Sequence, residues 1–84
     1  MTNEQIDKFV QTAYLDKVAV QINFKTRSPL QGIFINSNDF NELKGKNMWR
    51  IVSESRMEEY KKTKDSGLAR IFNGSEIVKL GLVS

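Results

Sequence analysis

The chain has 84 residues, 39% of them hydrophobic, with five Phe, two Tyr and one Trp, which fits one small folded domain and excludes a disordered segment. It has no cysteine and no histidine, which excludes disulfides, a thiolate nucleophile and the commonest general base and metal ligand. The net charge is +3. The first 16 residues have a net charge of −2, so the basic excess lies in the residues after them. That excess is compatible with a nucleic-acid partner or with an ordinary basic surface.

Residues 3–16 are predicted to form an amphipathic helix. Apolar residues recur at three- and four-residue spacing, at Ile6, Phe9, Val10, Ala13 and Tyr14. Thr2 and Gln5 have the spacing of a capping box. The apolar stripe either packs on a sheet or docks a partner. Glu4 and Asp7 stand where a secretion signal needs an apolar run, and no run reaches the ~18 residues of a membrane span, so we expect a cytoplasmic protein.

Residues 18–35 are predicted to form two strands. Val18, Val20, Ile22 and Phe24 alternate with polar residues, which is typical of a strand with one buried face. Pro29 interrupts the pattern, and Leu30–Ile35 resumes it with apolar residues on both faces, which indicates a strand covered on both sides. Gly32 within it indicates a bulge, a bend or a close backbone approach. A bent second strand is how a small sheet curls into a barrel.

Residues 36–47 are predicted to form a polar loop that can include one helical turn. Phe40 within it either covers the edge of the core or stays exposed to stack on a base. Residues 48–53 are predicted to be a third strand with Trp49 and Ile51 on one face, Trp49 being a structural residue.

Residues 55–64 are predicted to be a short helix that Asp65-Ser66-Gly67 ends, although one long hairpin through this region is an alternative. The basic and aromatic cluster here could bind phosphate and a base, or be a solvated helix face: Tyr60, Lys61, Lys62 and Lys64. Residues 68–72 and 75–80 are predicted strands, residues 81–84 a tail, and Asn73-Gly74 is a strong hairpin signal between the two strands.

The chain lacks the sequence motifs of an enzyme. It has no Gly-rich phosphate loop, nucleophile elbow or metalloprotease helix. Glu58 and Glu59 are its only adjacent carboxylates, and neighbours on a helix point in different directions. We therefore expect a non-enzymatic protein with no catalytic residue, no metal site and no cofactor.

The expected fold is mainly β with α: an N-terminal helix, then a strongly bent five-stranded antiparallel barrel with a short helix between strands three and four, in one domain of residues 1–84 (helix 3–16, barrel 18–80). This arrangement resembles the Sm-like family of the Lsm and Hfq proteins. The resemblance to the family's first motif lies in Val20, Ile22, Phe24 and Lys25, followed by Gly32, Ile33 and Phe34. Residues 71–77, IFNGSEI, resemble its second motif, with Asn73 where the family has arginine or a Tyr-Lys-His run.

The resemblance implies a homo-oligomeric ring, closed by strand four of one subunit pairing with strand five of the next, that binds single-stranded RNA. The residues that would contact RNA are then Asn36, Asn38, Phe40, Asn41, Lys44, Lys46, Arg70 and Asn73. The alternative is an SH3-like barrel that binds a protein through the N-terminal helix or the 36–47 loop.

Overall fold

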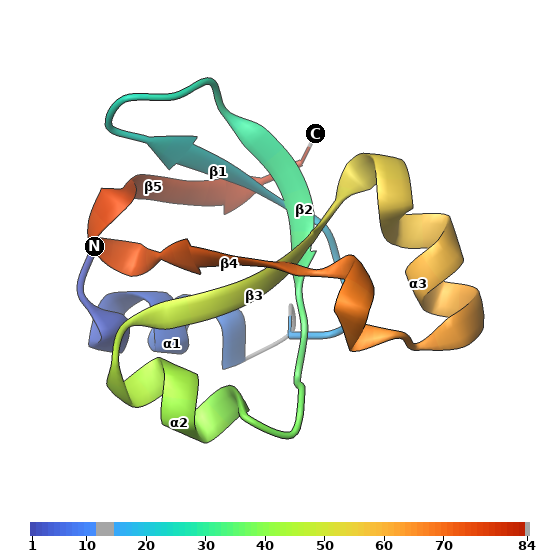
Figure 1. The fold of residues 1–84 in the computed structure, drawn as a ribbon. Helices are drawn as coiled ribbons and strands as arrows, with labels where there is room; N and C mark the ends of the chain where they lie inside the picture. The colour runs from blue at the N-terminus through green and yellow to red at the C-terminus, as the bar shows by residue number, and fades with distance from the viewer. Residues whose placement is uncertain (12–14, 84) are drawn as a thin grey trace.

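The computed structural model describes residues 1–11 and 15–83 and confirms the predicted fold class: an N-terminal helix, a five-stranded antiparallel sheet, and a short helix between strands three and four (Figure 1). In chain order the elements are α1 (Asn3–Gln11), β1 (Val20–Phe24), β2 (Leu30–Phe34), α2 (Phe40–Gly45), β3 (Met48–Ser53), η1 (Glu54–Arg56), α3 (Met57–Thr63), η2 (Ser66–Leu68), β4 (Arg70–Asn73), η3 (Gly74–Glu76) and β5 (Ile77–Leu82), where η marks a 3-10 turn.

The strand order in the sheet is β4-β3-β2-β1-β5, so β4 and β5 are its two edges. The sheet is strongly curled (Figure 1). Side chains of different strands meet across its interior. The rings of Phe24 on β1 and Phe72 on β4 lie 5.5 Å apart although two strands separate β1 from β4 in the sheet. The main core fills this interior, and α1 adds Ile6 and Val10 to it.

β2 is covered on both faces, as its apolar sequence predicted. Phe34 belongs to the main core together with Trp49 and Ile51. Ile33 and Ile35 belong to a second cluster with Val52 and Tyr60. α3 contributes Tyr60 to that cluster, so the helix between β3 and β4 is packed on the outer face of β2.

Gly32 marks a close backbone approach, one of the three interpretations of its position. A Cβ at Gly32 would lie 2.7 Å from the carbonyl oxygen of Val52 and 2.9 Å from Cγ2 of Ile51. Gly32 pairs with Ser53 in the β2–β3 ladder, so the two strands meet here without room for a side chain. The strand irregularity lies elsewhere, between Asn23 and Phe24 where β1 pairs with β5.

The first helix begins as predicted. Gln5 N–H donates to Thr2 Oγ1 at 3.2 Å and Thr2 N–H donates to Gln5 Oε1 at 3.0 Å, which is the reciprocal capping box. The predicted end at residue 16 is wrong. Residues 12–14 lie outside the described part, and Leu15–Lys17 form a turn in which Asp16 has φ 62°. The predicted apolar positions Ala13 and Tyr14 lie outside the described residues.

The first strand is shorter than predicted at its start, because Val18 lies outside β1 and is 48% exposed. The third strand, Met48–Ser53, has the predicted bounds and the predicted buried face. Within residues 36–47, the helical turn allowed by the sequence is α2.

The predicted helix at 55–64 is confirmed as η1 followed by α3, and the long-hairpin alternative is wrong. Its end differs from the prediction, because Lys64 rather than a glycine has the left-handed conformation, at φ 55°. The interpretation of Tyr60 as a base-stacking residue is also wrong. Its side chain is buried, and its hydroxyl donates to Asp16 Oδ1 at 2.6 Å.

The predicted hairpin at Asn73-Gly74 is wrong. β4 pairs with β3 and β5 pairs with β1, and η3 connects them. Gly74 lies close to Asn47, because its N–H donates to the Asn47 carbonyl at 2.7 Å. Glycine is required there because a Cβ would collide with Asn47 Oδ1. β4 and β5 both start later than predicted, and Leu68 lies in η2 rather than in a strand. Gly81 and Leu82 belong to β5 rather than to a tail.

Candidate nucleic-acid interface

The residues predicted to contact RNA do not form one site. Asn73 lines a hollow of about 310 Å³ with Phe24, Arg27 and Phe72. Asn38 lines a second, of about 260 Å³, with Asp39, Arg50 and Ser66. Arg70 lines a third, of about 450 Å³, with Ser53, Ser55 and Arg56. Three of the eight predicted contacts, Asn38, Arg70 and Asn73, therefore lie in three different hollows.

The amide side chains before and within α2 are accessible, whereas Phe40 is not free to stack on a base. Asn36, Asn38 and Asn41 are exposed. Phe40 packs against the main core, its ring edge-on to Trp49 at 5.9 Å. Phe40 therefore covers the edge of the core, the first of its two interpretations.

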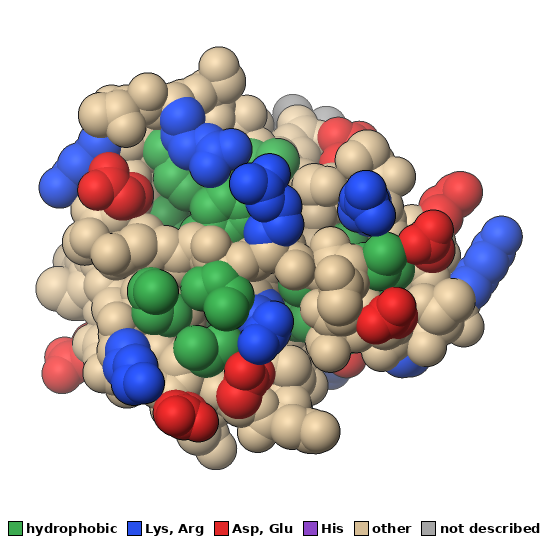
Figure 2. All heavy atoms as spheres, viewed as in Figure 1, with side chains coloured by type: hydrophobic (Ala, Val, Ile, Leu, Met, Phe, Trp, Pro, Cys, Tyr) green, Lys and Arg blue, Asp and Glu red, His purple; other side chains and the backbone are tan. Residues whose placement is uncertain are grey.

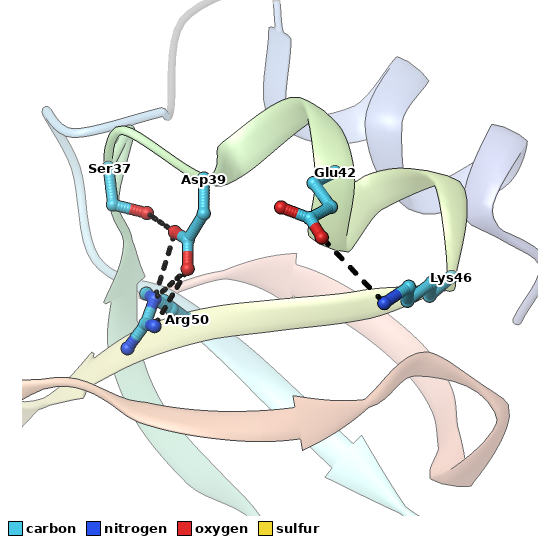
Figure 3. A network of polar contacts seen from close by, with 5 residues as sticks. All are labelled: Ser37, Asp39, Glu42, Lys46 and Arg50. Carbon is cyan, nitrogen blue, oxygen red and sulfur yellow. Dashed lines mark hydrogen bonds and ion pairs between the residues drawn. The ribbon is translucent and has the colours of Figure 1, made fainter.

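The two lysines of this region are paired with acids. Lys44 Nζ lies 3.5 Å from Asp7 and 5.6 Å from the centre of the Phe40 ring. Lys46 Nζ lies 3.8 Å from Glu42 one helical turn earlier (Figure 3). These pairs lower the local positive charge that either lysine can offer to a phosphate, so neither is the strongest candidate for such a contact.

Asp39 and Arg50 form the best-defined ion pair of the structure. The guanidinium of Arg50 donates to both carboxylate oxygens, with Nη2 2.8 Å from Oδ2, and Ser37 Oγ donates to Oδ1 at 2.5 Å (Figure 3). The hydrogen bonds from Arg50 and then from Ser37 lower the pKa of Asp39 from 3.8 to about 2. Arg50 therefore anchors the start of α2 to β3 and is not free to bind a ligand.

The Asp39 carboxylate should make stability depend on acid pH. Because its pKa is lower in the folded chain, the ionised form stabilises the fold above pH ~4, and this contribution is lost as the pH falls toward 2. Urea unfolding between pH 6 and pH 2 should show that loss in the parent chain and a flatter profile in Asp39→Asn. Parallel profiles would contradict the pairing. Glu42→Gln, which removes an exposed carboxylate of the same helix, is the control.

The first hollow lies between the β1–β2 connection and the free edge strand β4. The Arg27 guanidinium lies 5.2 Å from the Phe24 ring centre and 5.3 Å from that of Phe72, an arrangement that cation–π attraction favours. Figure 2 shows basic side chains next to hydrophobic atoms in this upper part of the face. The sequence did not point to the exposed Arg27, because no periodic pattern relates it to Phe72, which comes 45 positions later.

Asn73, at the other side of this hollow, already has a structural role. Its Oδ1 accepts hydrogen bonds from the N–H of Ser75 at 2.9 Å and from Ser75 Oγ at 2.8 Å. Because the oxygen of the amide caps η3, the group that Asn73 can still offer to a ligand is its Nδ2 donor.

The third hollow contains two arginines with no acid among the residues that line it: Ser53, Ser55, Arg56, Gly67, Leu68, Ala69 and Arg70. Ser53 Oγ and Ser55 Oγ are 3.2 Å apart and hydrogen-bonded to each other. The sequence pointed to Arg70 but not to Arg56, because the turns η1 and η2 that bring the two together could not be foreseen.

No group of three acidic side chains that could hold a metal ion occurs in residues 1–11 and 15–83. Of the helices in the same ranges, none has the length and apolar character that crossing a membrane requires. Comparisons with models of protein families, with curated proteins and with solved structures gave no match to this chain.

Proposed function

We propose that the protein is a non-enzymatic RNA-binding protein of the Sm-like type, which forms a ring through β4 and β5 and acts in the cytoplasm. The cytoplasmic location is supported by the lack of cysteine, which fits a reducing compartment. The ring and the RNA contacts are supported by separate observations and are tested separately.

The observation that carries the proposal is the state of the two sheet edges. β4 and β5 each have one strand neighbour, β3 and β1 respectively. Both edges also expose large apolar side chains: Ile71 is 45% exposed on β4, and Val78 and Leu82 are 51% and 64% exposed on β5. An exposed edge of this kind is a template for pairing with another chain. Two different edges on one subunit allow head-to-tail pairing, which closes into a ring when the rotation is suitable.

RNA contact is supported by the groups around the free edge of β4. The Arg27 guanidinium lies within 5.3 Å of two aromatic ring centres, and a guanidinium plane is a platform on which an unpaired base can stack. The net charge of +3 is compatible with binding to the phosphates of a polyanion. The exposed amides of Asn36, Asn38 and Asn41, and Nδ2 of Asn73, can supply hydrogen bonds to base edges.

Native mass by light scattering tests the ring. We expect six or seven times the 9.7 kDa of one chain, and a mass that falls toward one chain in Ile71→Asn and in Val78→Asn. Removing an exposed apolar side chain costs the isolated subunit little, so both variants should stay folded. Val18→Asn changes an equally exposed valine outside both edge strands and should leave the mass unchanged.

RNA binding is measured on the same proteins with uridine-rich and adenine-rich oligonucleotides. Arg27→Gln should weaken binding several-fold more than Lys25→Gln, which removes the same charge two residues earlier in the same connection. A monomeric parent chain that binds neither oligonucleotide would refute the proposal and favour the alternative, a protein-interaction module.

A further inference from the structure

The connection between β3 and β4 brings two arginines to one hollow. Arg56 ends η1 just after β3, and Arg70 begins β4, opposite Ile51 in the β3–β4 ladder. The hollow they line, about 450 Å³ in volume, is the largest of the three described above. Figure 2 shows basic side chains on either side of the junction between the sheet and α3.

Neither arginine side chain has a hydrogen-bond or ion-pair partner in the described part of the chain. The ion pairs there use Lys44, Lys46 and Arg50, and Arg27 lies over aromatic rings. Two acids are close in sequence to the lining residues: Asp65, whose Oδ1 accepts from Gly67 N–H at 2.9 Å, and the exposed Glu54, which forms no ion pair with either arginine. Two fixed positive charges without an internal counter-ion favour an external anion.

The polar groups left for such an anion are side chains. The N–H groups of Gly67, Leu68 and Ala69 are all bound, to Asp65 Oδ1, Asp65 O and Ser66 O. Ser53 and Ser55 share one hydrogen bond between their hydroxyls, so one hydroxyl hydrogen of the pair remains to donate outward. Two guanidinium groups and a hydroxyl match the several acceptor oxygens of a phosphate group.

The hollow has a rigid support. α3, which follows Arg56, is held on the sheet by Tyr60 in the cluster of Ile33, Ile35 and Val52. The Tyr60 hydroxyl also donates to Asp16, which ties α3 to the turn before β1. Burial, and then the Asp16 bond, raise the pKa of Tyr60 to about 12, so this tie persists at neutral pH.

We propose that Arg56 and Arg70, with the hydroxyls of Ser53 and Ser55, form a binding site for a phosphate group. The site belongs to one subunit and does not depend on the ring. A phosphate monoester such as a nucleotide and the phosphodiester of RNA share the required chemistry. Only the RNA case rests on the function proposed above.

The test uses the full chain and three probes at low salt: adenosine 5′-monophosphate, adenosine, and an adenine decamer RNA with a 5′-hydroxyl. Arg56→Gln and Arg70→Gln should each weaken binding of a phosphate-bearing probe roughly tenfold, as expected for the loss of one charge-assisted hydrogen-bonding partner. Lys62→Gln removes the same charge from an exposed residue of α3 outside the hollow and should have less than a twofold effect. Melting temperature and native mass are recorded for every variant.

Loss confined to the monophosphate identifies a site for small phosphate esters, loss confined to the decamer identifies a backbone contact, and loss of both supports the shared chemistry. The site is refuted if the parent chain binds neither phosphate probe at millimolar concentration, if adenosine binds as well as its monophosphate, or if both variants bind like the parent. Binding of both phosphate probes that survives both substitutions would refute the site while the RNA-binding function stands. Arginine-dependent monophosphate binding without decamer binding would support the site and refute the RNA-binding function.

Discussion

Gly32→Ala should lower the free energy of unfolding by roughly 3 kcal/mol, the upper part of the range for an overpacked core site. The added Cβ would lie 2.7 Å from the Val52 carbonyl oxygen and 2.9 Å from Cγ2 of Ile51. The first of these atoms is backbone in the β2–β3 ladder, so it cannot rotate away as the end of a side chain can. A chain of this length is stable by only about 4–12 kcal/mol, and the loss should be plain in urea unfolding.

Gly81→Ala is the matched control, because Gly81 is also within a strand and a Cβ there would have no atom within 4 Å. We expect that variant to be as stable as the parent or slightly more stable, since alanine restricts the unfolded chain. Equal unfolding midpoints for the two variants would show that the strands can separate at Gly32 at little cost. The close approach would then not be what requires glycine at position 32.

Much of the fold could be predicted because local patterns and burial agree. The alternation from Val20 to Phe24 and in Met48–Ser53 matches faces that are buried in the structure. The consecutive apolar residues Ile33, Phe34 and Ile35 predicted cover on both sides, and the two core clusters provide it. These patterns are short-range, so they do not depend on the conformations of the connections between the strands.

The connections could not be predicted in the same way, because their conformations are set by distant contacts. Asn73-Gly74 has the composition of a tight hairpin, yet Gly74 instead packs beside Asn47. Among the described residues, positive φ occurs at Asp16, Asn47 and Lys64. None of the described glycines has positive φ. Turn propensity allows Asp and Asn at such positions but would not have placed Lys64 there.

The grouping of the candidate residues on the surface could not be predicted for the same reason. Which side chains share a hollow depends on the turns, so Arg27 and Arg56 were missed while the exposed amides were found. Phe40 and Lys44 have the chemistry of RNA contacts, but each has a partner within the chain. A sequence shows which groups are present, whereas their availability depends on tertiary packing.

Trp49→Ala should be the most destabilising single change, at roughly 3–5 kcal/mol, which is a large part of the stability of this small domain. The Trp49 side chain is 1% exposed and meets the rings of Phe34 and Phe40 edge-on, each at 5.9 Å. Truncation would leave a cavity between β2, β3 and α2. Urea unfolding should show the loss, with a near-native far-ultraviolet spectrum in the fraction that folds.

Trp49→Phe separates bulk from hydrogen bonding. It keeps most of the aromatic packing but removes the Nε1 donor to Asn47 Oδ1 at 2.9 Å. We expect a smaller loss of about 1–3 kcal/mol, the cost of an acceptor left without its partner. A loss as large as that of Trp49→Ala would mean that the hydrogen bond outweighs packing, and a loss below 1 kcal/mol in Trp49→Ala itself would contradict its place in the core.

Asn47 explains why that hydrogen bond affects more than one strand. At φ 57° its Nδ2 donates to the Met1 carbonyl at 3.0 Å and its own carbonyl accepts from Gly74, so one residue joins the start of α1, β3 and η3. Asn47→Gly removes the side chain without strain at positive φ. In that background Trp49→Phe should cost less than in the parent, and Gly74→Ala, which collides with Asn47 Oδ1, should be better tolerated. Additive losses would show that the three residues act independently and that the Asn47 side chain is not what requires glycine at position 74.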